Sequence, residues 1–448
     1  MNGARYPTSR GPRRFLHRSA NPDGERASTF KRGFMSTFTL DVIGRGLSAL
    51  ATIAFIRALG VSSFAYLVLF LNIGQFAGSA LTGGIRMRYM RTEAERVSRG
   101  LEGETGFALA MVTSLLFVLG VSVLALLGVT FFESGGSQSD RWLFVALTAA
   151  YTAANAAIEM GIFHYQAHLK FVRAGLVGIA RGGAIIVVAI AAAFGLTESG
   201  PLTAALVTAA IFLVALAVCW PLVRRTLSLP RASSFRGEFG RESAWLTLYY
   251  LGSAGFAYAD IFIVAGFLDD AAVSSYGAAL RYIAIVLGPM PALIAVMRVR
   301  TSQRDLVDSG NAQADLLGSW IRRSLLPVTL FIAAAAVAAP FLIPLLDGGR
   351  YPDSIPIFQV MLLPALINYL TVPGPNLLMT QRRYRLLAVI YGVALAVQLV
   401  AAGGIAIVSG VVAVAAVASF VGALEAGLVA AVAVRLARRR PGVAEAPA

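Results

Sequence analysis

Long apolar runs recur along almost the whole chain, and they constrain its fold more than any other feature. A helix needs about 20 apolar residues to cross the hydrocarbon of a bilayer. No alternating strand pattern appears, so the runs predict membrane-spanning helices. We expect twelve spans, at 34–58, 64–85, 105–130, 141–163, 171–194, 201–223, 243–267, 273–297, 324–346, 354–380, 384–408 and 411–434. Only 14% of the residues are charged, against about a quarter in a soluble domain, which favours one polytopic membrane protein.

The arginine and lysine residues alternate in position with the predicted spans. Of the 38 basic residues, 32 fall in the two ends of the chain or in the connections that follow even-numbered spans. The opposite connections hold only Arg141 and Arg350. The positive-inside rule therefore predicts that both termini are cytoplasmic. It also explains the net charge of +15 by topology and by contact with anionic lipid headgroups, so no nucleic-acid partner is expected.

Composition divides the chain into five parts. We expect a disordered basic tail at 1–33, a six-helix lobe at 34–223, a cytoplasmic linker at 224–242, a second six-helix lobe at 243–436 and a cytoplasmic tail at 437–448. The start of translation, at Met1 or Met35, stays open.

Two short echoes divide the spans into equal halves. The residues VSSF at 61–64 open the second span, and VSSY at 273–276 open the eighth, 212 residues later. Lys170 and Phe171 are echoed by Arg383 and Tyr384 at nearly the same offset. Six spans per half give both halves one orientation, so we predict two lobes related by a parallel repeat, with a cleft between them. The second half is richer in proline, and we expect more bent helices there.

Ionisable residues inside spans are costly and mark candidate functional sites. There are eight: Asp41, Arg45, Arg57, Glu159, Arg181, Asp260, Arg281 and Glu425. Asp41 and Arg45 lie four residues apart and either neutralise each other or hold and tune an anion. Arg57 either snorkels to the interface or binds substrate. Arg181 has no acidic residue within reach on its own helix.

Three further charged residues inside the spans, and two tyrosines near them, complete the candidate site. Asp260 and Arg281 have similar predicted depths, so we expect that they pair. Glu425 has either a packing role or a role in ion coupling. Tyr258 and Tyr282 lie near Asp260 and Arg281 in the sequence. Sugar rings stack on aromatic side chains, so these two tyrosines are candidate sugar-binding residues. No catalytic constellation, metal-ligand pattern, cofactor motif or Walker A sequence is present, and no enzyme activity is expected.

Three segments resemble a known family. The residues RALGVSSFAY at 57–66, Asp260 followed by VSSYGAALR at 273–281, and LDGGRY at 346–351 resemble signatures of Wzx-type polysaccharide flippases. These belong to the multidrug/oligosaccharidyl-lipid/polysaccharide exporter superfamily. The resemblance covers nearly all of 34–436 and implies two six-helix lobes around a central cleft. The proline that usually ends the eighth helix of the family is missing from 297–300. The related lipid II flippases usually have fourteen helices, and twelve spans disfavour that branch.

The resemblance predicts a flippase in the bacterial plasma membrane for a lipid-linked oligosaccharide. Arg45, Arg57, Arg181 and Arg281 would contact its pyrophosphate and Tyr258 and Tyr282 its sugars. Asp41, Glu159, Asp260 and Glu425 would balance charge or couple ions. Two alternatives stay open: a drug/cation antiporter on the same fold, and a non-transporting subunit of a polysaccharide assembly complex. Membrane lipids are expected partners, and polysaccharide polymerases or glycosyltransferases are candidate ones.

Overall fold

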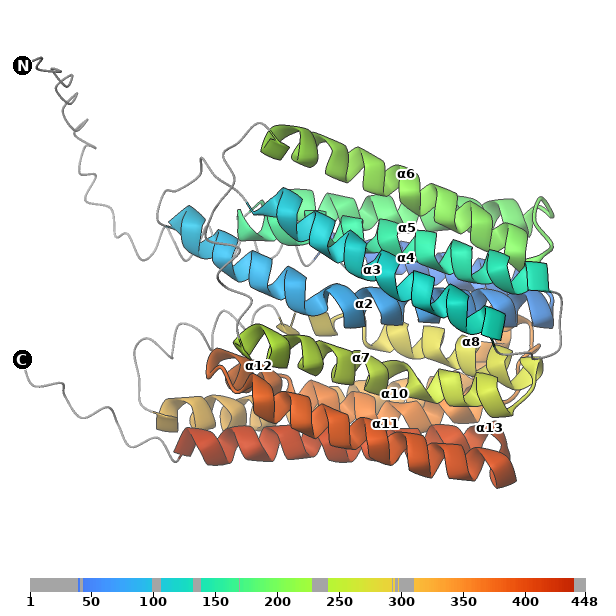
Figure 1. Ribbon diagram of the computed structural model, residues 1–448. Coiled ribbons are helices and arrows are strands. Elements are labelled where there is room, and N and C mark those ends of the chain that lie inside the picture. The colour runs from blue at the N-terminus through green and yellow to red at the C-terminus, as the bar shows by residue number, and fades with distance from the viewer. Residues whose placement is uncertain are drawn as a thin grey trace, which may run out of the picture.

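The computed structural model describes residues 39–40, 43–98, 106–131, 138–168, 170–227, 241–291, 293–294, 297 and 310–438. These residues form a bundle of long helices that run roughly along one common direction (Figure 1). Within these ranges no strand occurs. The predicted tail at 1–33 lies outside the described residues, as do residues 439–448 of the predicted tail at 437–448 and most of the predicted linker.

A helical segment at 43–58 precedes the labelled helices. These are α2 (Val61–Ser98), α3 (Phe107–Phe131), α4 (Gln138–Ala167), α5 (Phe171–Ala193), α6 (Gly200–Leu227), α7 (Arg241–Phe267), α8 (Asp270–Val286), α10 (Gly310–Asp347), α11 (Ser354–Thr371), α12 (Pro373–Thr380) and α13 (Tyr384–Arg438).

The helices account for the twelve predicted spans. In the part of the chain that the structure describes, eight stretches, one of them the whole of α13, are long and apolar enough to cross a membrane, and 107–123 is a shorter apolar helix. Gly410 interrupts α13 with φ 67° and ψ −179°, a region that only glycine enters readily. This glycine divides α13 into the eleventh and twelfth spans at the predicted place. The tenth span consists of α11 and α12, which Pro373 at the start of α12 separates.

Three helix ends differ from the predicted spans by more than ten residues. The ninth span was predicted to begin at residue 324, but α10 begins at Gly310, and the eighth was predicted to end at residue 297, but α8 ends at Val286. The second span was predicted to end at residue 85, but α2 continues to Ser98, because nothing in 86–98 breaks a helix. The proline-rich second lobe holds Pro327, Pro340 and Pro344 inside α10 and Pro364 inside α11.

The helices pack as two lobes. In the first, α4 contacts α2, α3, α5 and α6, and in the second, α13 contacts α7, α10, α11 and α12. The main contacts between lobes are those of α2 with α7 and α8. Both sequence echoes lie at helix starts. Val61 is the first residue of α2 and Val273 the fourth residue of α8, whereas Phe171 opens α5 as Tyr384 opens α13.

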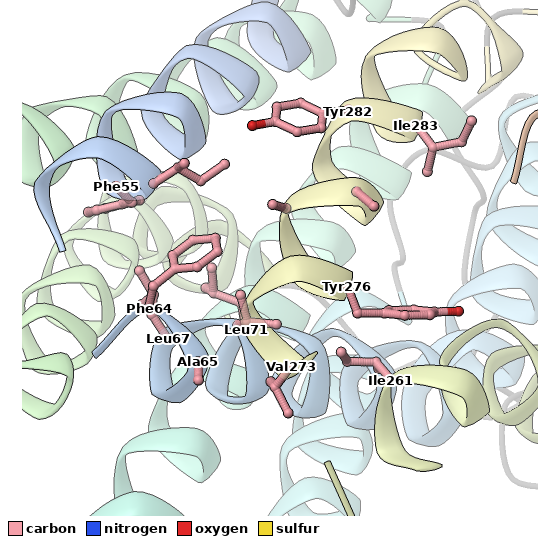
Figure 2. Close-up of a cluster of buried hydrophobic side chains, with 14 of the residues drawn as sticks. Phe55, Phe64, Ala65, Leu67, Leu71, Ile261, Val273, Tyr276, Tyr282 and Ile283 are labelled. Atoms are coloured by element: carbon pink, nitrogen blue, oxygen red, sulfur yellow. The ribbon is translucent and has the colours of Figure 1, made fainter. Parts of the chain in front are cut away.

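The first echo brings its two copies together. The Ser274 hydroxyl donates to the Val61 carbonyl at 2.8 Å. Figure 2 shows Phe64 and Leu71 of α2 facing α8, which carries Val273 in the same buried cluster. We call this end of the bundle, where α2 and α8 begin, the outer end. The opposite end, where α2 and α4 finish and α5 and α7 begin, is called the basic end, after the arginine-rich connections of the sequence.

Small residues let the lobes approach. At Gly84 of α2, an added Cβ atom would lie 2.6 Å from the Thr247 hydroxyl oxygen and 3.0 Å from the Thr247 Cα. At Gly83 it would lie 2.5 Å from the Tyr250 ring. Because apolar burial gives little drive for helices to associate inside lipid, such close van der Waals packing holds membrane helices together.

Candidate substrate cavity

A cavity of about 570 Å³ lies between the two lobes. Its walls come from the segment 43–58, α2, α4 and α5 on one side and from α7 and α8 on the other. The α2 residues in the wall run from Leu71 to Arg86, which is about 22 Å along a helix at 1.5 Å per residue. The cavity therefore extends from the interior of the bundle toward the basic end.

The charged groups of the cavity wall are mostly cationic. Arg45, Arg86, Arg181 and Arg281 contribute four guanidinium groups, and Glu159 contributes one carboxylate. Among the described lining residues, the formal balance is +3. A water-filled cleft with this balance attracts anions from solution and from the membrane surface.

Glu159 holds two of these arginines in place. Its carboxylate accepts from Arg181 Nη1 at 2.6 Å and forms an ion pair with Arg86 Nη1 at 3.4 Å. The same Arg181 nitrogen lies 3.4 Å from Asn155 Oδ1. The sequence found no acidic partner for Arg181 on its own helix, and the structure supplies one from α4. Arg181 keeps 30% of its side chain exposed, so it remains available to a ligand.

Arg281 has a guanidinium nitrogen in the wall that no described residue satisfies, as Arg86 does at its Nε. The Arg281 Nη2 atom is buried and has no hydrogen-bond partner among the described residues. Tyr151 and Tyr258 line the same cavity, and the Tyr258 hydroxyl donates to Gln75 Oε1 at 3.2 Å. A buried donor without a partner costs free energy that a bound acceptor would recover.

The predicted pairing of Asp260 with Arg281 is wrong. Asp260 instead accepts from the Tyr276 hydroxyl at 2.6 Å and from the backbone N–H of Ile261 at 2.8 Å. Similar depth on two neighbouring helices does not by itself bring two side chains together, because the rotation of each helix decides which side chains meet. Asp260 is also absent from the cavity wall.

Arg57 lies at the outer end, away from the cavity wall. Its Nε donates to the Leu346 carbonyl at 2.8 Å, and a second guanidinium nitrogen donates to the Leu345 carbonyl. Arg350, from the other lobe, donates to the Arg57 carbonyl at 2.8 Å. These contacts join the first lobe to the end of α10, so the two lobes are closed against each other at the outer end.

One tyrosine, Tyr351, supports this closure, and a second, Tyr282, forms a contact within the second lobe beside it. Tyr282 is buried and donates to Asp347 at 3.3 Å, so it does not line the cavity in this conformation. Tyr351, between α10 and α11, packs against Phe64 with ring centroids 5.6 Å apart. Burial raises the pKa of the Tyr351 hydroxyl, so the group stays neutral there.

The other predicted site residues are scattered. Arg45 lines the cavity. Its predicted neighbour Asp41 lies outside the described residues. Glu425 of α13 is buried in the second lobe, where its Oε1 atom has no hydrogen-bond partner among the described residues, and it does not line the cavity.

The sequence missed Arg86 as a cavity residue. It was counted with the arginines of the connection after span two, because that span was predicted to end at residue 85, one residue before Arg86. The position of Arg86 on the uninterrupted α2, two residues after a glycine pair that packs against α7, was the available signal.

Comparisons with known proteins define the fold. No family model and no curated protein matches the chain. Among solved structures, the lipid II flippase MurJ in an inward closed conformation aligns with a TM-score of 0.69 and 11% identity, over 89% of this chain and 87% of that one.

Two further structures of the MOP superfamily agree. An inward-facing multidrug resistance MATE transporter aligns with a TM-score of 0.68 and 12% identity, over 91% of this chain and 99% of that one. A transporter from Pyrococcus furiosus, described as having a binding pocket of reverse polarity, aligns at 0.61 and 14% identity, over 91% and 95%. The protein is a multi-pass membrane protein with the twelve-helix, two-lobe fold of MOP superfamily transporters.

Proposed function

We propose that the protein is a flippase that moves a lipid-linked oligosaccharide across the bacterial plasma membrane by alternating access. The observation that carries the proposal is the cavity between the lobes, with four arginines against one glutamate in its described wall. The substrate class combines a polar sugar head, an anionic diphosphate and a lipid tail, and each part has a counterpart in this architecture.

The arginines match the diphosphate. Guanidinium groups bind phosphate oxygens through two parallel hydrogen bonds and stay charged at any physiological pH. Arg181 is oriented by Glu159 at 2.6 Å, which fixes its direction before the ligand arrives. Arg281 has a buried N–H donor without a partner, and a phosphate oxygen would satisfy it.

The dimensions match a headgroup. A volume of about 570 Å³ lies within the range of small-molecule sites, so the cavity has room for a diphosphate with its first sugars. The lipid tail would stay outside, between the lobes or in the bilayer. Tyr151 and Tyr258 supply aromatic surface and hydroxyl groups for the sugar.

The closed outer end corresponds to one of the two states that alternating access requires. With the Arg57 and Arg350 contacts formed, the cavity is separated from the outer end of the bundle. Rocking of the lobes would break these contacts and bring the cavity to the other side. This order assigns the basic end to the cytoplasm and loading to the inner leaflet. The bacterial plasma membrane and the cytoplasmic termini are part of the proposal.

The two alternatives differ in what they require. A drug/cation antiporter needs a net acidic cleft, and the described wall has a balance of +3, which disfavours it. A non-transporting subunit of a polysaccharide assembly complex would not need the cavity cations at all. The polymerase and glycosyltransferase partners remain expectations that accompany the proposal.

The test is the position of the lipid-linked precursor in cells. In a double variant, Arg181→Ala with Arg281→Ala, the precursor should accumulate on the cytoplasmic leaflet and surface polysaccharide should fall. Arg323→Ala is the matched control, because Arg323 is an exposed arginine outside the cavity wall. Normal export by a well-expressed double variant would contradict the proposed function. A drug-resistance phenotype with intact surface polysaccharide would favour the antiporter instead.

A further inference from the structure

A cluster of metal-ligating side chains lies near the basic end of the first lobe. Glu93 of α2, His164 of α4 and His168 just after α4 each offer one ligand atom, and these atoms all lie within 4.8 Å of one another. Glu93 is 4% exposed. None of the three lines the substrate cavity.

The spacing of the two histidines suits a shared ion. Residues four apart on a helix lie on one face, and the His164 and His168 ring centroids are 4.5 Å apart. Glu93 Oε1 lies 3.1 Å from His168 Nε2. A tetrahedral zinc ion with bonds of about 2.0–2.1 Å holds its ligand atoms about 3.3 Å apart. One pair already has this separation, and the third atom needs a side-chain adjustment on the order of 1 Å.

A neighbouring residue supplies support of the kind that metal-bound histidines have. The Tyr89 hydroxyl lies 2.6 Å from His164 Nδ1, and the two rings are stacked at 15°. With the Nδ1–H donating to the Tyr89 oxygen, Nε2 of His164 carries the lone pair for a metal. Ligating histidines usually donate their other ring N–H to such a partner, which fixes the tautomer and the ring orientation.

We propose that Glu93, His164 and His168 bind one zinc-class divalent ion that braces α2 against α4. Two imidazole nitrogens and one carboxylate oxygen form a known zinc ligand set, in which water takes the fourth position. The ordinary alternative is a glutamate–histidine ion pair that needs no metal.

The brace would act on the cavity through the same two helices. Glu93 follows Arg86 by two turns on α2, and His164 follows Glu159 by little more than one turn on α4. Arg86 and Glu159 form the ion pair of the cavity wall. A metal that fixes the separation of α2 and α4 thus supports that pair, whatever the transported substrate is.

The first experiment measures zinc bound to the whole protein, purified without a polyhistidine tag. The wild-type chain should retain about one zinc per chain after dialysis, and Glu93→Gln and His168→Gln should each weaken binding by about tenfold or more. His17→Ala is the matched control, because it removes the only other histidine of the chain. Equal zinc binding by the wild type and both ligand variants would overturn the proposal.

The second experiment needs no variant and so does not depend on their folding. X-ray absorption of the zinc-loaded wild type should show nitrogen and oxygen ligands at about 2.0–2.1 Å, including two imidazoles. A sulfur ligand would place the ion at Cys219, and a spectrum with no imidazole would place it at surface carboxylates. Either result would refute the assignment.

Discussion

The closure of the outer end depends on a small number of hydrogen bonds, so one substitution should shift its equilibrium. Arg57→Ala removes the two bonds to the carbonyls of Leu345 and Leu346, and it leaves the bond from Arg350 to the backbone carbonyl of residue 57. A hydrogen bond contributes about 0.5–1.5 kcal/mol net. Because the Arg57 side chain is exposed, we take the lower part of that range.

The two bonds together then contribute about 1–2 kcal/mol to the closed state. At about 1.4 kcal/mol per factor of ten, their loss raises the ratio of outward-open to closed molecules about 5- to 30-fold. The shift is this large only if the bonds exist in the closed state and are absent from the open one, as alternating access requires.

A cysteine in the cavity reports this ratio. Thr52→Cys places a thiol in the cavity wall, and Cys219→Ala removes the only native cysteine. In sealed right-side-out vesicles, the initial rate of labelling by a membrane-impermeant thiol reagent is proportional to the open fraction. Arg57→Ala should raise this rate about 5- to 30-fold, and Arg323→Ala should leave it unchanged. An unaltered rate in Arg57→Ala would refute the assignment of Arg57 to the closure.

Three further predictions concern packing and are checked by thermal unfolding in detergent. Gly410→Ala should destabilise the protein by about 1–3 kcal/mol, since φ is 67° there. The control, Gly403→Ala, is at a helical position with open space around it and should not be destabilised. Equal melting temperatures of the two variants would contradict the break in α13. Gly84→Ala should lower the melting temperature because its methyl group meets backbone atoms of α7, and a stability equal to that of Gly403→Ala would argue against the close approach of α2 and α7. Tyr276→Phe removes one of two donors to the half-buried Asp260 carboxylate and should cost about 1–3 kcal/mol. In an Asp260→Ala background the acceptor is gone, so the same substitution should cost much less if the two side chains interact as described.

The sequence was a good guide to the course of the chain. The thickness of the bilayer sets the length of each apolar run, and the topology of the chain sets the alternation of arginines. Both patterns can therefore be recognised from residues that are neighbours in the sequence. The break at Gly410 and the starts of α2 and α8 followed from the same reasoning. The end of α2 did not, because hydrophobicity stops at the membrane while a helix continues until its backbone is interrupted.

The site was only partly predictable. Arg45, Arg181, Arg281 and Tyr258 were selected as costly or sugar-binding residues inside spans, and all four line the cavity. Their partners were not predictable, because a pair such as Arg181 and Glu159 depends on how α4 and α5 are rotated.

The depth of a residue along its predicted span also could not distinguish the contacts that close the outer end from the residues that line the cavity. Arg57 was grouped with the substrate arginines, but it lies at the outer end on backbone carbonyls. The Glu93–His164–His168 cluster was not recognised in the sequence for the converse reason, since Glu93 and His164 lie 71 residues apart and meet only where α2 and α4 pack.

The most direct test of the central claim is translocation by the purified protein in liposomes. A lipid-linked oligosaccharide diphosphate with a fluorescent sugar is placed in both leaflets, and the fraction that reaches the outer leaflet is followed over time. The wild-type protein and Arg323→Ala should move the substrate at equal rates. Arg181→Ala and Arg281→Ala should each slow the movement, since each removes charge-assisted hydrogen bonds worth about 1.5–3 kcal/mol, or about 10-fold or more in rate. Undiminished translocation by both cavity variants, or no translocation by the wild type alongside export of an organic cation, would contradict the account.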